Sequence, residues 1–185
     1  MSVPVFLHIG LQKTGTSYLQ TIFWGNVEVL AAQGLAMLPG SRRESFHLML
    51  DVRDRLRPFD PSEARSILPG LPSRLGATRG TRVLISEESF APCTDDQIAR
   101  LLAALEGHPV HVIVTCRDIA RQVPSVWQQG LQSGRSITLE RYLRRLRSTE
   151  GDLRDGAIAF ARQMAEKPIP RTRDRQIASV DPTAL

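Results

Sequence analysis

The chain has 185 residues, of which 42% are hydrophobic and 23% charged, and this composition is typical of one globular domain with a sizeable core. It contains neither an apolar run of about 18 residues nor the basic start of a secretory signal, so we expect a cytoplasmic protein without a membrane-spanning segment. The net charge of +5 does not indicate specific nucleic-acid binding: residues 141–185 hold ten basic and six acidic residues, which leaves fourteen and thirteen for residues 1–140. Cys93 and Cys116 lack CxxC spacing and a neighbouring histidine cluster, so we expect neither a disulfide framework nor a bound metal.

The first forty residues carry a strand pattern, a helical pattern and a second strand pattern. Residues 3–9 form an apolar run that predicts a buried strand. From Ser17, apolar residues recur at steps of three and four and stop before Gly34, which predicts one helix packed on a sheet. Residues 35–38 predict a short second strand.

The segment 41–80 is rich in proline after an initial helical pattern. Residues 46–56 predict a helix. The four prolines between positions 58 and 72 then predict turns with one short helix between them.

The remaining elements alternate between strand and helix, which predicts βαβ units and a parallel sheet flanked by helices on both faces. The predicted strands are residues 82–86 and 110–116. Thr94 and Gln97 have the spacing of a capping box before a helix that ends at Gly107. Two more helices are predicted, one from residue 119 to Gly134 interrupted by Pro124, and one after Thr138.

The turn between the first strand and helix has the features of an anion-binding loop. It reads Gly10-Leu11-Gln12-Lys13-Thr14-Gly15-Thr16-Ser17 and holds one of only two lysines in the chain. The glycines permit a tight turn, and backbone N–H groups at a helix N-terminus attract phosphate-like groups. Lys13 adds a point charge, and Thr16 and Ser17 supply hydroxyl donors. The lysine precedes the second glycine by two residues, so this is not the GxxxxGK[ST] loop of nucleoside-triphosphate binding.

A second group of anion-binding residues follows the last predicted strand. Arg117 comes directly after it, and Ser125 lies eight residues later in the next helix. A guanidinium can bind two phosphate oxygens at once, and the hydroxyl supplies another donor. Since ligands of parallel sheets bind beyond the carboxyl ends of the strands, we expect the loops 10–17, 86–90 and 117–125 to open on one rim.

Together these two groups resemble the PAPS-dependent sulfotransferases, PAPS being 3′-phosphoadenosine 5′-phosphosulfate. In that family a loop with the order Lys-Thr-Gly-Thr-Ser holds the 5′-phosphosulfate, and an arginine after a later strand, with a serine eight residues on, holds the 3′-phosphate. The resemblance covers residues 1–147 and implies a P-loop-like sulfotransferase fold that is incomplete at its C-terminal end. The residues it implies for PAPS are Gln12, Lys13, Thr14, Gly15, Thr16, Ser17, Arg117 and Ser125.

The resemblance also implies sulfuryl transfer without a metal, in which Lys13, Thr16 and Ser17 stabilise the leaving charge. Family members use a histidine or glutamate as general base. We favour Glu87 or Glu88, because adjacent carboxylates at a strand end repel one another and can raise the pKa of one of them. Glu44 and His47 are the alternatives.

Residues 151–185 do not match the glycine-rich and basic late loop that usually follows in the family. We therefore divide the chain into a sulfotransferase-like α/β domain at 1–150 and a poorly patterned basic tail at 151–185, expected to be largely disordered. Two alternatives stay open: a nucleotide kinase or other phosphoryl transferase, which the position of the lysine disfavours, and a truncated relative that binds nucleotide without catalysis. For the acceptor, sugars, lipids, peptides and small alcohols or phenols all remain candidates.

Overall fold

Four parallel strands form the centre of residues 2–147, the part of the chain that the computed structural model describes. They are β1 (Val5–His8), β2 (Leu35–Met37), β3 (Arg82–Ser86) and β4 (Val110–Ile113). Their order in the sheet is β2-β3-β1-β4, and Val5 pairs in register with Val83 on one side and Val110 on the other. All four strands therefore end at the same edge. The predicted α/β class with a parallel sheet is confirmed.

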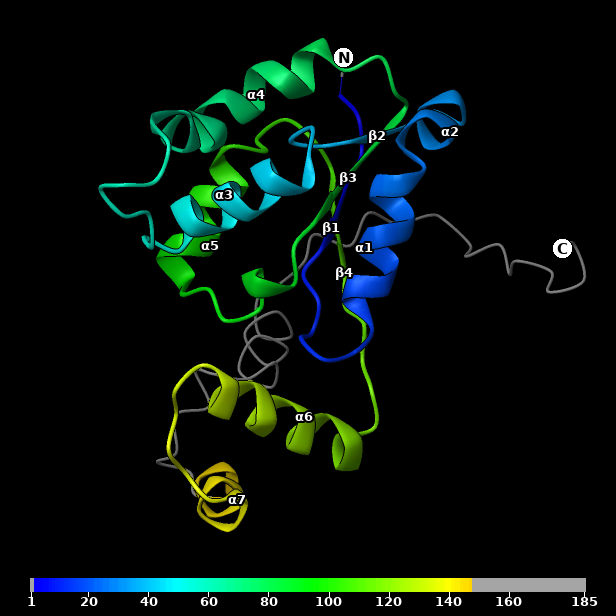
Figure 1. Ribbon diagram of the computed structural model, residues 1–185. Helices are drawn as coiled ribbons and strands as arrows, with labels where there is room; N and C mark the ends of the chain where they lie inside the picture. The colour runs from blue at the N-terminus through cyan, green and yellow to red at the C-terminus, as the bar shows by residue number, and fades with distance from the viewer. Residues whose placement is uncertain (1, 148–185) are drawn as a thin grey trace, which may run out of the picture.

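Helices lie on both sides of this sheet and beyond its carboxyl edge. They are α1 (Thr16–Gly25), α2 (Val27–Ala32), α3 (Arg42–Val52), α4 (Ile67–Ala77), α5 (Asp95–Ala103), α6 (Ile119–Gln132) and α7 (Leu139–Arg147), with the 3-10 helices η1 (Ser62–Ser66) and η2 (Glu88–Phe90). In Figure 1, α3, α4 and α5 cover one face, α1 lies against the other, and α6 and α7 lie past the ends of the strands. None of these helices is both long and apolar enough to cross a membrane.

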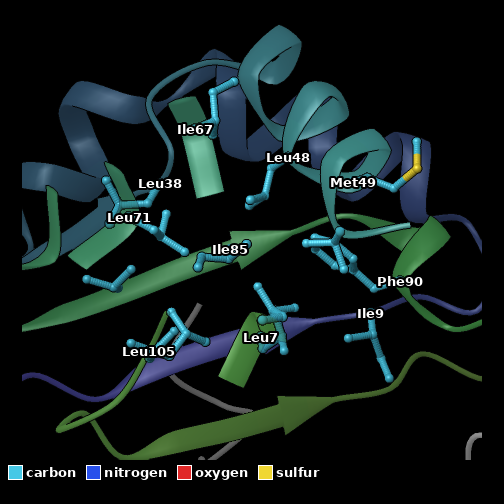
Figure 2. Packing of buried hydrophobic residues seen from close by; sticks show 14 of the residues in the cluster. Leu7, Ile9, Leu38, Leu48, Met49, Ile67, Leu71, Ile85, Phe90 and Leu105 are labelled. Atoms are coloured by element: carbon cyan, nitrogen blue, oxygen red, sulfur yellow. The ribbon is translucent and has the colours of Figure 1, made fainter. Parts of the chain in front are cut away.

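The hydrophobic core lies between the sheet and the layer of α3, α4 and α5. Leu7 and Ile85 point from the sheet toward Leu48 of α3 and Leu71 of α4 (Figure 2), and all four side chains are buried. Full burial of a leucine or isoleucine side chain contributes about 1.5–3 kcal/mol. This face therefore supplies most of the apolar stabilisation and fixes the strand ends that carry the site.

The opposite face is covered only in part. The ring of Phe6 stacks on that of His111 with centroids 5.1 Å apart, and the side chain of Ile113 is 40% exposed. α1 contributes no buried apolar side chain. Within residues 2–147, helices therefore lie on both faces of the sheet, as predicted, but the face of α1 is covered less completely.

Three predicted elements differ from the structure. The helix predicted from Ser17 to Gly34 is two helices that meet at Asn26, whose φ of −127° is not helical. The proline-rich segment is predicted as turns with one short helix. A turn is present at residues 58–60, but η1 and the eleven-residue α4 follow it, and the prolines at 69 and 72 lie within α4. Pro72 lies inside α4, where burial of Ile67, Leu71 and Leu75 offsets the lost backbone hydrogen bond. α6 likewise continues through Pro124 without interruption.

Candidate anion and acceptor site

The loop between β1 and α1 has an unusual backbone. Gly10 and Gly15 have φ values of +92° and +95°, and Lys13 has a φ of +65°, which L-residues other than glycine rarely adopt. A Cβ atom on Gly10 would lie 2.9 Å from the Cα atom of Glu88. The loop thus passes directly against η2, the segment that carries the acidic pair.

The N-terminus of α1 is open to an anion. Gly15 occupies the N-cap position, so no side chain accepts a hydrogen bond from the first turn, and this turn contains no acidic residue. The first N–H groups of a helix need an acceptor and stand at the positive end of its dipole. This arrangement fits the phosphate end of a nucleotide.

Both predicted cations lie beside this loop. The Nη1 atom of Arg117 is 3.3 Å from the carbonyl oxygen of Lys13 and donates a hydrogen bond to it. The Nζ atom of Lys13 donates to Oε1 of Gln129 on α6 at 2.7 Å. A third contact joins the same elements, because Nε2 of Gln122 donates to the carbonyl oxygen of Gln12 at 3.0 Å. Two segments more than a hundred residues apart in sequence therefore meet at one rim.

The predicted hydroxyl donors occupy different surroundings. Ser17 is exposed, whereas Thr16 is buried with 2% of its surface accessible, so of the two only Ser17 offers an exposed hydroxyl. The hydroxyl of Thr14 donates to the carbonyl oxygen of Leu11 at 2.6 Å, which stabilises the turn. The hydroxyl of Ser125 donates to the carbonyl oxygen of Arg121 within α6 at 2.9 Å, so in this structure it does not contact the loop.

A buried histidine links the loop to the acidic segment. Nδ1 of His8 lies 2.8 Å from Oγ of Ser86, and Nε2 lies 3.3 Å from Oγ1 of Thr115. Thr115 is in turn 2.8 Å from the hydroxyl of Thr14. Burial lowers the pKa of His8. The imidazole is therefore neutral near pH 7 and acts as a fixed connection between the ends of β1, β3 and β4.

The predicted bases Glu87 and Glu88 follow β3 at the same edge. The backbone N–H of Glu87 donates to the carbonyl oxygen of His8 at 2.9 Å, and its side chain accepts from the N–H of Ser89 at 3.1 Å. Burial raises the pKa of both carboxyls, and the charge of Glu87 raises that of Glu88 further. Lys13 and Arg42 act in the opposite direction on Glu88. Glu88 therefore lies within electrostatic reach of both the loop and α3.

A cavity of about 530 Å³ opens beside this acidic pair. Its walls come from α1, α3 and η2, and they include Gln20, Arg42, Arg43, Phe46, Glu87 and Glu88. The two alternative bases contact other groups. Glu44 forms an ion pair with Arg74 at 2.8 Å, and the ring centroid of His47 lies 6.2 Å from that of Phe46. In residues 2–147 no group of three or more His, Cys, Asp or Glu side chains is placed to hold a metal ion.

Sequence reasoning missed several residues of this region, including two glutamines of α6 and two arginines of α3. Gln122 and Gln129 are seven positions apart on α6 and thus share one face of the helix, a signal that the sequence does contain. Arg42 and Arg43 follow Ser41, which caps α3 by accepting from the N–H of Glu44 at 3.1 Å. Basic residues directly after a cap oppose the helix dipole, and this unfavourable placement could have marked them.

Comparisons with protein-family models, with curated proteins and with solved structures give no significant match to this chain. The tail predicted at 151–185 lies outside the residues that the structure describes.

Proposed function

We propose that the protein binds PAPS and transfers its sulfuryl group to a hydroxyl or amine of an acceptor. One observation carries the proposal: Arg117 contacts the backbone of Lys13, so two cations from separate segments meet at the loop that precedes α1, a helix whose N-terminus has no side-chain cap. A nucleotide with anionic groups at both ends of its ribose needs cations from more than one element. The resemblance of the loop and of the Arg117 and Ser125 pair to the sulfotransferases gives the nucleotide its identity.

PAPS would supply a sulfuryl group bonded to a phosphate oxygen. That sulfur–oxygen bond breaks as the acceptor oxygen or nitrogen bonds to sulfur, and the leaving phosphate keeps the electron pair. Lys13 and the first N–H groups of α1 oppose the negative charge that develops on the leaving oxygen. Glu87 or Glu88 accepts the proton of the acceptor, and its raised pKa makes it a stronger base than an exposed glutamate.

Arg117 has the role of holding the 3′-phosphate. Its guanidinium now donates to a neutral carbonyl, and a phosphate oxygen is the stronger acceptor because the hydrogen bond is then assisted by charge on both sides. Ser125 lies two turns into α6 and can add its hydroxyl after a rotation away from the carbonyl of Arg121.

Calorimetry with adenosine 3′,5′-bisphosphate and with ATP–Mg²⁺ tests the nucleotide. We expect the bisphosphate to bind more tightly than ATP, and Lys13→Ala and Arg117→Ala each to weaken it by about 10- to 100-fold, the loss typical of one hydrogen bond to a charged group. Arg79→Ala is the control, because Arg79 is an exposed arginine just before the amino end of β3.

The other outcomes separate the alternatives. Tighter binding of ATP–Mg²⁺ would favour a phosphoryl transferase. Bisphosphate binding without transfer of labelled sulfate from PAPS would favour a non-catalytic relative. Failure to bind either nucleotide would contradict the proposal.

A further inference from the structure

We propose that the acceptor is a small organic molecule with a hydroxyl at one end and a carboxylate or sulfate at the other, and that Arg43 binds this anionic group. The inference rests on the proposed sulfuryl transfer and assigns the cavity between α1, α3 and η2 as the acceptor site. Three independent observations support it.

The first observation is an excess of cations at the start of α3. Arg42 and Arg43 are its first two residues, where the positive end of the helix dipole disfavours them. Glu44, the acidic residue of this turn, is paired with Arg74. Neither Arg42 nor Arg43 has an ion pair within the part of the chain that the structure describes. Both arginines line the cavity and are exposed. The charge of Arg42 acts on Glu87 and Glu88, so we assign Arg43 to the anionic group of the ligand.

The second observation is a pair of unsatisfied polar atoms on two residues that line the cavity. Gln20 is 6% exposed, and its Nε2 atom has no hydrogen-bond partner. The Oε2 atom of Glu88 is also buried and without a partner. An unmet polar atom in such a place costs about 1–3 kcal/mol. Both atoms are covered in this structure, so we expect the two side chains to turn toward the cavity when an acceptor binds. The hydroxyl of the acceptor would then accept from the amide of Gln20 and donate its proton to the carboxylate of Glu88.

The third observation is an apolar surface between these polar ends. The ring of Phe46, one turn along α3 from Arg42 and Arg43, is 50% exposed and lines the same cavity. A ring or short hydrocarbon unit of the acceptor can pack on it. The hydroxyl of such a molecule then lies at Glu88 while its anionic group lies at Arg43.

The test uses two probes that differ only in charge, 4-hydroxyphenylacetate and 4-hydroxyphenylacetamide. Each is titrated into the full chain and followed by NMR through the side-chain amide of Gln20. We expect the carboxylate to bind about tenfold more tightly than the amide, as one charge-assisted hydrogen bond requires. Arg43→Gln should abolish this difference, and the matched Arg79→Gln should retain it.

Equal binding of the two probes, a preference that persists in Arg43→Gln, or no shift of the Gln20 amide with either probe would overturn the inference. Titration of the same samples with adenosine 3′,5′-bisphosphate separates the two proposals. If the bisphosphate binds but the probes show no charge preference, the acceptor assignment alone fails. If the preference is present but the bisphosphate does not bind, the proposed function fails and the anion site at Arg43 stands.

Discussion

Gly10 is the residue at which the anion loop comes closest to the acidic segment. Its φ of +92° lies in the region that favours glycine, and a Cβ atom there would collide with backbone and side-chain atoms of Glu88 at 2.9 Å. We predict that Gly10→Ala destabilises the protein by about 1–3 kcal/mol, because the loop or η2 must shift. Urea unfolding measures this loss.

Gly76→Ala is the control for that experiment. Gly76 lies within α4, and nothing would meet an added Cβ atom within 4 Å. Alanine is the better helix former, so this variant should be as stable as the parent or more stable by up to about 1 kcal/mol. Equal effects of the two substitutions would show that the close approach to Glu88 does not constrain the loop.

Glu88 gives a second prediction at the scale of one residue. Burial raises the pKa of its carboxyl in the folded state above that in the unfolded chain. Between the pKa of the unfolded chain and the higher pKa of the folded protein, the folded protein binds more protons than the unfolded chain. The free energy of unfolding therefore falls as pH rises through this range. Glu88→Gln removes the titration. The stability of the variant relative to the parent should therefore increase from pH 4 to pH 8.

Urea unfolding at several pH values measures that difference. Asp96→Asn serves as control, since Asp96 is an exposed carboxylate on the first turn of α5. If the difference between Glu88→Gln and the parent does not change with pH, the carboxyl is not desolvated as the structure indicates.

At the scale of elements, α5 shows how local sequence can fix a boundary. The hydroxyl of Thr94 accepts from the N–H of Gln97 at 3.4 Å, and the side chain of Gln97 accepts from the N–H of Thr94 at 3.1 Å, as the capping box predicts. We expect Thr94→Ala to cost about 1 kcal/mol of unfolding free energy. Thr21→Ala, an exposed mid-helix control on α1, should be neutral or slightly stabilising, and a similar loss at both sites would contradict the role of the cap.

The strands, and the position of the loop at residues 10–17 between a strand and a helix, follow from the sequence in the same way. Each of the four predicted strands appears, because short apolar runs bounded by turn residues have few other solutions in a chain of this length. Lys13, Glu87 and Arg117 meet at one edge because parallel strands end together. α4 is longer than the one short helix predicted in this segment, because the prolines at 69 and 72 argue against a helix locally, whereas the burial of its apolar face decides the outcome.

The cavity itself was harder to predict. Gln20 lies on α1 and Arg43 on α3, and no local pattern indicates that these helices meet beside η2. The contact made by Ser125 could not be predicted either. Its spacing from Arg117 is a matter of sequence, but the direction of its hydroxyl depends on the nearest carbonyl, that of Arg121.

At the scale of the whole molecule, α6 is attached differently from α3, α4 and α5, each of which buries apolar side chains. None of the residues of α6 is buried. Three side-chain hydrogen bonds connect this part of the chain to the loop: Gln122 donates to the carbonyl of Gln12, Lys13 donates to Gln129, and Arg117, just before α6, donates to the carbonyl of Lys13. α4, by contrast, buries three large apolar side chains. Helices with few buried contacts open locally at low cost, so we predict that amides of α6 exchange with solvent more than about tenfold faster than those of α4.

Nucleotide binding should change this pattern, because it would join the loop at residues 10–17 to α6 through Arg117 and Ser125. With adenosine 3′,5′-bisphosphate at a hundred times its Kd, an element that must be closed for binding gains about 2.7 kcal/mol, which slows its exchange by roughly 100-fold. Hydrogen exchange followed by mass spectrometry should show this slowing in both α6 and the loop, with α4 unchanged as the internal reference. Slowing of the loop alone would mean that the nucleotide is held at one end only, and that α6 takes no part in the site.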